Sequence, residues 1–155
     1  MAEIIKAGAE QLEDVLALRR EVLAVVNGRS EDSISGEIME YSREYFSSGD
    51  QTTVLAYDGE TAVGCATICY VSLMPTFDHP TGRRAHIMNV YMRDGYRRQG
   101  IAGQMLNVIL EEARERGVTY VDLDATDMGK PLYETLGFSS SEEYMGLNLL
   151  QRARG

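Results

Sequence analysis

The sequence predicts a single α/β (α+β) domain over residues 1–155, in which about four helices flank a mixed central β-sheet. Two patterns carry this prediction. A β-hairpin signal, Asp58-Gly59, lies between two strand-like runs in the middle of the chain. Further on, the helical segment 103–116 joins two apolar runs as a crossover joins two parallel strands. The expected order of elements is β-α-α-β-β-β-α-β-α-β.

The N-terminal part begins with a short strand over 3–7. Apolar residues then recur at helical spacing over 12–26, and Gly28 supplies a C-terminal cap. Residues 30–45 predict a second helix with a weaker pattern, because Gly36 lies inside it. These helices are expected to cover a sheet formed by the rest of the chain.

In the rest of the chain, alternating or continuous apolar runs separated by Gly, Pro and Asp predict the remaining strands and helices. Expected strands lie over 52–57, 62–73, 84–92, 118–126 and 138–150, and expected helices over 103–116 and 127–136. At this length the chain can bury one hydrophobic core without disulfides.

Composition narrows the possible functions. The net charge of −9 argues against general nucleic-acid binding, which needs a basic surface. No run approaches the roughly 20 apolar residues of a membrane span, and the N-terminus has no signal-peptide pattern, so a cytoplasmic protein without membrane association is expected. Cys65 and Cys69 lie about 13 Å apart along one strand, too far for a disulfide. With two histidines and no ligand spacing, no metal site is expected.

The segment 90–103 is the most informative part of the chain. An apolar strand ends in a turn rich in Gly and Arg, and a helix follows at once. Free N–H groups and the positive end of the helix dipole would meet there, an arrangement that binds anions and especially phosphates. Arg97 and Arg98 add full positive charges, and Gly100 lets a ligand approach the main chain.

Two common phosphate-binding motifs do not fit this turn. Gly95 and Gly100 have the spacing of a P-loop, but Ile101-Ala102 stands where Lys-Ser/Thr is required. The dinucleotide motif G-x-G-x-x-G is absent as well. The turn instead resembles the R/Q-x-x-G-x-G/A pyrophosphate loop of the GCN5-related N-acetyltransferase (GNAT) superfamily. The matching residues are Arg97-Arg98-Gln99-Gly100-Ile101-Ala102.

A second segment supports the same resemblance. Residues 131–138, Pro-Leu-Tyr-Glu-Thr-Leu-Gly-Phe, are similar to the A-x-x-L-Y-x-x-x-G-F segment of that superfamily. The resemblance implies acetyl-CoA as cosubstrate, held between splayed parallel strands. Main-chain groups of the strand would hold the pantetheine arm, and the turn would hold the pyrophosphate. The implied cofactor-binding residues are Val90, Tyr91, Met92, Arg97, Arg98, Gln99, Gly100, Ile101, Ala102 and Gly103.

The resemblance gives Tyr133 the role of general acid toward the CoA thiolate. A phenol with a pKa of about 10 can deliver a proton to a thiolate whose conjugate acid has a pKa of about 8.5. The general base stays open between His86, on the cofactor strand, and Asp122 or Asp124, on the next strand. The two aspartates are two positions apart and therefore face the same side of their strand.

Together these residues predict transfer of an acetyl group from acetyl-CoA to a primary amine of a small molecule or a peptide. The alternative is a non-catalytic acyl-CoA-binding domain that acts as a sensor or in an assembly. Homodimers are common in the superfamily, so a homodimer is compatible with the resemblance. The acceptor is not defined by the sequence.

Overall fold

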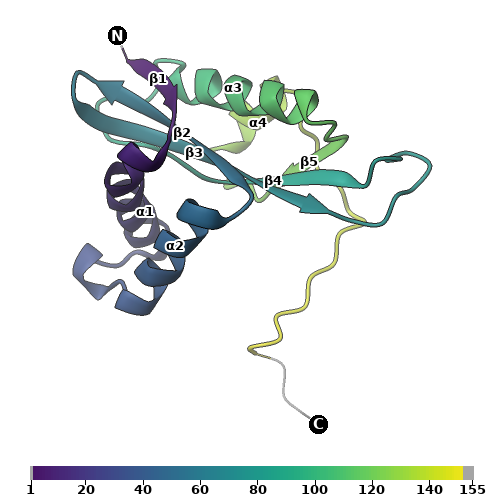
Figure 1. Cartoon of the computed structure of the whole chain (residues 1–155), viewed down its shortest axis with the longest axis horizontal. Coiled ribbons are helices and arrows are strands. Elements are labelled where there is room, and N and C mark those ends of the chain that lie inside the picture. The colour runs from purple at the N-terminus through teal and green to yellow at the C-terminus, as the bar shows by residue number, and fades with distance from the viewer. Residues whose placement is uncertain (1, 152–155) are drawn as a thin grey trace. The chain divides into compact units, whose positions relative to one another are not determined.

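The computed structural model describes residues 2–151, which form two compact units. The first unit extends to Asp124, and the second begins at Ala125. We describe each unit by itself. Figure 1 shows the whole chain. In the described residues no helix is both long and apolar enough to cross a membrane.

The first unit contains one five-stranded sheet with the order β1-β2-β3-β4-β5. The strands are β1 (Glu3–Lys6), β2 (Gln51–Asp58), β3 (Thr61–Ser72), β4 (Arg83–Met92) and β5 (Tyr120–Leu123). Neighbouring strands pair antiparallel except β4 and β5, which pair in parallel. The predicted mixed sheet is therefore confirmed, including the hairpin and the parallel pair joined by a crossover helix.

Three helices cover the two faces of this sheet (Figure 1). They are α1 (Leu12–Asn27), α2 (Gly36–Ser48) and α3 (Ile101–Glu115), and short 3-10 turns precede α1 and α2. The first two helices lie on one face and α3 lies on the other. Gly28 ends α1 in the left-handed conformation, as the sequence predicts. The second helix begins at Gly36, because the Ser35 hydroxyl accepts a hydrogen bond from the Ile38 N–H at 3.2 Å.

The apolar face of α1 packs on the sheet through buried side chains. Leu18 of α1 and Leu55 of β2 have no exposed surface, and Tyr91 of β4 packs against the same cluster. On the opposite face, α3 buries its own stripe of apolar residues. The apolar residues of that stripe are Ile101, Met105, Leu106, Ile109 and Ala113. The alternation of side chains along β2 and β3 supplies both layers.

Substitution of Leu18 by Ala should destabilise the protein strongly. The change leaves a cavity under α1, and such changes lower the free energy of unfolding by about 2–5 kcal/mol. Val26 of the same helix is 74% exposed, so Val26→Ala should change it by less than about 0.5 kcal/mol. Urea unfolding of the two variants measures the difference. Equal midpoints would contradict this account of the core.

The sheet opens between β4 and β5. Their pairing covers only Arg84–Ile87 against Tyr120–Leu123, although β4 continues to Met92. A β-bulge lies just past the last pair, where Asn89 adopts a left-handed φ of 62°. The part of β4 beyond Ile87 therefore presents main-chain N–H and C=O groups on the side that β5 leaves unpaired.

In the second unit the expected terminal strand over 138–150 is wrong. The structure has one short helix there, α4 (Lys130–Thr135), and no strand within 125–151. Apolar side chains of the segment are exposed instead, with Met145 at 92% and Leu150 at 97%. Alternation shows which residues could share a face, but a strand forms only where another strand offers main-chain partners.

Candidate cofactor and acceptor site

The turn after β4 is built around three left-handed residues. Gly95, Arg98 and Gly100 have φ values of 91°, 62° and 78°. Gly100 is the N-cap of α3, so the helix begins at Ile101, two residues earlier than expected. The first helical bond runs from the Gln104 N–H to the Gly100 carbonyl at 3.1 Å. The preceding N–H groups of the first helical turn consequently have no partner inside the helix.

Those free N–H groups belong to residues that the sequence predicts to bind pyrophosphate. Within residues 2–151, the main-chain N–H groups of Gly100 to Gly103 donate no hydrogen bond to a main-chain or side-chain acceptor. A Cβ built on Gly100 would meet no atom within 4 Å, so the space above its Cα is open. An anion can therefore approach these donors directly, and the turn fits a diphosphate.

Two side chains in the first half of the turn connect it to other elements. The Arg93 guanidinium donates to both carboxylate oxygens of Glu21 on α1, at 2.7–3.1 Å. The Tyr96 hydroxyl donates to Asp58 at 2.5 Å. These contacts join the turn to α1 and to the end of β2, so the donors are held in place before any ligand arrives.

The two arginines of the motif have different surroundings. Arg97 Nε donates to the Met92 carbonyl at 3.0 Å, and its Nη1 lies 3.2 Å from Asp94. Arg98 is exposed, and in the described residues no carboxylate lies within 4.0 Å of it. Arg98 is therefore the charge in the motif that is free to meet an anion, while Arg97 also shapes the turn.

The predicted pantetheine-binding residues turn their side chains into the protein. Tyr91 packs against the core under α1. Met92 is buried and covers Gly64, where an added Cβ would lie 2.2 Å from the Met92 sulfur. Val90 lies between them and the bulge. Val90 and Tyr91 stay half-buried, and Tyr91 also lines a surface pocket beside Arg93, so the strand offers main-chain groups together with part of these two side chains.

The structure brings the three candidate bases together. His86 Nδ1 lies 2.6 Å from Asp122 Oδ1, and His86 Nε2 lies 3.9 Å from Asp124 Oδ2. The pairing follows from the parallel register, in which His86 and Asp122 are direct partners. A proton on Nδ1 satisfies the Asp122 carboxylate and leaves the Nε2 lone pair facing Asp124, which is 94% exposed.

Tyr133 lies in α4 of the second unit. Its ring packs edge-on against Phe138, with centroids 6.0 Å apart. Burial raises the pKa of the Tyr133 phenol, which keeps the hydroxyl protonated at neutral pH. A protonated phenol is the form that a general acid requires.

Sequence reasoning missed one polar group on the α1 side of β4. Arg19 of α1 donates to Asn89 Oδ1 at 3.2 Å, and Asn89 donates in turn to Thr67 Oγ1 at 3.3 Å. In the sequence Arg19 resembles any charged residue of an amphipathic helix. Nothing in a one-dimensional pattern shows that it points toward a bulge seventy residues away.

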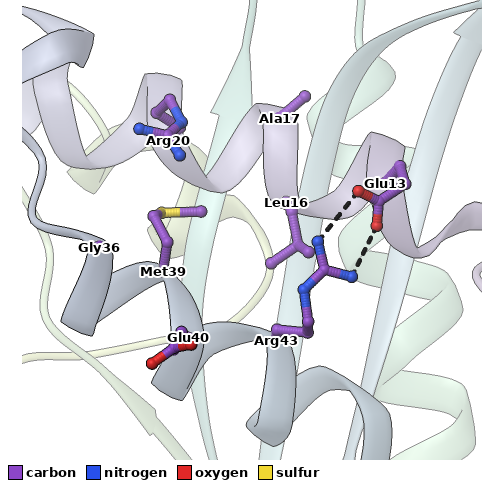
Figure 2. Close-up of a pocket in the computed structure, with 8 residues that line it drawn as sticks. All are labelled: Glu13, Leu16, Ala17, Arg20, Gly36, Met39, Glu40 and Arg43. Carbon is purple, nitrogen blue, oxygen red and sulfur yellow. Dashed lines mark hydrogen bonds and ion pairs between the residues drawn. The ribbon is translucent and has the colours of Figure 1, made fainter.

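A separate pocket of about 400 Å³ lies between α1 and α2 (Figure 2). Arg43 bridges it by donating to both carboxylate oxygens of Glu13, at 2.8 and 3.0 Å. Arg20 and Glu40 also line it. None of the predicted catalytic or cofactor-binding residues contributes to this pocket, so we do not place the site there.

Comparisons with known proteins identify the family of the chain. A sequence model of the acetyltransferase (GNAT) family matches residues 20–138, well over half of the chain. The chain belongs to this family.

Three similar proteins illustrate the range of the match. A protein of Clostridium acetobutylicum, described as a predicted acetyltransferase and solved with acetyl-CoA, is 27% identical with a TM-score of 0.84, over 98% of this chain and 99% of that one. Glucosamine 6-phosphate N-acetyltransferase of Trypanosoma brucei brucei is 31% identical over 87 residues, which are 56% of this chain and 57% of that protein. N-acetyltransferase 8B of Rattus norvegicus is 27% identical over 112 residues, 70% of this chain and 48% of that protein. The chain thus spans about half the length of the curated relatives that it matches.

Proposed function

We propose that the protein transfers the acetyl group of acetyl-CoA to a primary amine of a small molecule. One observation carries the proposal. A single turn joins the open end of β4 to the free N–H groups at the start of α3, so one continuous segment offers donors for a diphosphate and main-chain partners for an amide-containing arm. The relative solved with acetyl-CoA supports the same cosubstrate.

Each part of this segment has a distinct task. The N–H groups of Gln99 to Gly103, together with Arg98, bind the diphosphate. Main-chain groups of Val90 and Met92 bind the pantetheine arm and orient the thioester. Acetyl-CoA supplies an activated acetyl group when bound. The rigid contacts of Arg93 and Tyr96 keep the donors in position, so little ordering is needed on binding.

We assign proton removal from the amine to His86. Asp122 holds the imidazole ring through Nδ1, so Nε2 can accept the proton directly or through one water. Asp124 faces the same nitrogen and can attract the cationic form of the amine before its proton leaves. The resulting imidazolium lies between the carboxylates of Asp122 and Asp124.

We assign protonation of the leaving thiolate to Tyr133, on the basis of the motif that contains it. Its raised pKa keeps the phenol protonated at neutral pH, and a thiolate whose conjugate acid has a pKa of about 8.5 can take that proton.

Incubation with acetyl-CoA and a panel of primary amines, with free thiol measured over time, tests the proposal. We expect amine-dependent thiol release, with the acetylated amine identified by mass spectrometry. Glucosamine 6-phosphate belongs in the panel because it is named as the substrate of a relative. Stabilisation by acetyl-CoA without turnover of any amine would instead favour a non-catalytic acyl-CoA sensor.

Tyr133→Phe should lower turnover at least tenfold, since the variant keeps the ring and removes only the hydroxyl proton. Binding of acetyl-CoA should stay near that of the unmodified protein, because the pyrophosphate turn is untouched. Steady-state kinetics and calorimetric titration with acetyl-CoA measure the two quantities. Unchanged turnover would remove Tyr133 from the acid role.

A further inference from the structure

Arg19 on α1 is a half-buried cation without a counter-charge. Its guanidinium makes one hydrogen bond, to the neutral amide oxygen of Asn89. Within the part of the chain that the structure describes, no carboxylate lies within 4.0 Å of it. A guanidinium carries five N–H donors, so most of the hydrogen-bonding capacity of Arg19 is unused.

The ionisable neighbours of Arg19 do not neutralise it. They are the thiols of Cys65 and Cys69, and burial raises the pKa of both. The Cys65 thiol, with a pKa of about 12, is neutral at physiological pH. Burial also lowers the pKa of Arg19, because desolvation disfavours its charged form. An anion placed against the guanidinium would relieve this penalty.

Two other arginines that contact α1, Arg93 of the turn after β4 and Arg43 of α2, are paired with carboxylates. Arg93 and Arg43 each meet a carboxylate on α1 through a two-oxygen contact, with Glu21 and Glu13 respectively. Arg19 is more deeply enclosed than Arg43, which is exposed, yet it has no such partner. Carboxylates of α1 therefore neutralise Arg43 and Arg93, whereas in the described residues Arg19 has no carboxylate partner.

The position of Arg19 connects it to the proposed reaction. Its partner Asn89 forms the bulge of β4 and directly precedes Val90, the first main-chain residue assigned to the cosubstrate. His86 and Asn89 both project toward the α1 side of the sheet. His86 does so because it is the cross-strand partner of Cys69, whose side chain lies on that side of β3. Asn89 does so because it contacts Arg19 of α1. His86 and Asn89 are three residues apart, or about 10 Å along the strand.

We propose that Arg19 binds an anionic group of the acceptor, a carboxylate or a phosphate, while the amine of the same molecule lies toward His86. This inference rests on the proposed function and narrows its acceptor to small molecules that carry a primary amine and, several bonds away, an anionic group. A guanidinium suits both anions because its N–H groups match two oxygens at once.

Pairs of amines that differ only in the anionic group test the proposal. β-Alanine against β-alaninamide examines a carboxylate, and glucosamine 6-phosphate against glucosamine examines a phosphate. Rates are measured with acetyl-CoA, and affinities are measured by calorimetric titration of each amine into protein saturated with CoA. The wild-type protein should prefer the charged member of at least one pair, in kcat/KM and in Kd, by roughly tenfold or more.

Arg19→Gln should abolish this preference by weakening only the charged acceptor, mainly through KM. Arg19→Lys should keep part of it, because the charge remains and the two-oxygen contact is lost. Arg20→Gln is the matched control, since Arg20 is the next residue of α1 and lines the separate groove between α1 and α2 (Figure 2). It should leave the preference unchanged.

The outcomes separate the two proposals. Equal losses on charged and neutral acceptors in Arg19→Gln would show that Arg19 only supports the bulge, and would overturn the anion site. The absence of any charge preference in wild-type rates and affinities would overturn it as well. Binding of a charged amine that depends on Arg19, without turnover of any amine, would keep the anion site and refute the acetyltransferase function.

Discussion

Gly100→Val should lower the affinity for acetyl-CoA by about 100-fold or more. The valine side chain would occupy the open space above Gly100, where the diphosphate must approach the N–H groups of the first turn of α3. Loss of two charge-assisted hydrogen bonds, at about 1.5 kcal/mol or more each, corresponds to a factor of this size. Calorimetric titration with acetyl-CoA measures the affinity directly.

A matched variant separates ligand blocking from backbone strain. Gly28 has a φ of 61°, close to the 78° of Gly100, and a Cβ there would also meet nothing within 4 Å. Gly28→Val therefore imposes a similar left-handed strain, of order 1–2 kcal/mol, at the end of α1. It should lower thermal stability without weakening acetyl-CoA binding. If both variants weaken binding equally, the turn at Gly100 is not the diphosphate site.

His86→Gln should lower kcat/KM for the amine about 100-fold at neutral pH, since a general base typically contributes two or more orders of magnitude. Glutamine keeps a polar side chain at this position of β4 but cannot accept the proton. The affinity for acetyl-CoA should not change. Steady-state kinetics at saturating acetyl-CoA, together with a titration of the cosubstrate, measure both effects.

The other histidine of the chain provides the control for this variant. His79 lies in the loop between β3 and β4, where its ring contacts Thr119 Oγ1 at 3.0 Å. His79→Gln should leave kcat/KM near the wild-type value. Retention of full activity in His86→Gln would move the role of base away from this imidazole, with Asp124 as the next candidate to substitute.

Most of the first unit could be predicted from the sequence because its signals are local. The apolar stripe before Gly28 defines α1, the turn after Asp58 defines the hairpin, and the Gly-rich segment after Met92 defines the start of α3. In each case residues within a few positions of one another determine the conformation. The candidate cofactor site lies in one such continuous segment, so a local motif is enough to propose its residues.

Features that depend on distant pairing could not be predicted in the same way. The contact between His86 and Asp122 depends on the register of two parallel strands, which the sequence does not specify. The contact between Arg19 and Asn89 depends on the bulge in β4. The expected strand over 138–150 failed for the same reason, because an alternating pattern cannot reveal whether a pairing partner is available.

The bidentate contact between Arg93 and Glu21 has a consequence for how the two ligands influence each other. Glu21 lies two residues after Arg19 on α1, so the helix that carries Arg19 is also fastened to the turn that precedes α3. A cosubstrate that shifts or stiffens this turn acts on the same helix as an acceptor bound at Arg19. Thermodynamic linkage then requires reciprocity: whatever factor the cosubstrate applies to acceptor affinity, the acceptor applies to cosubstrate affinity.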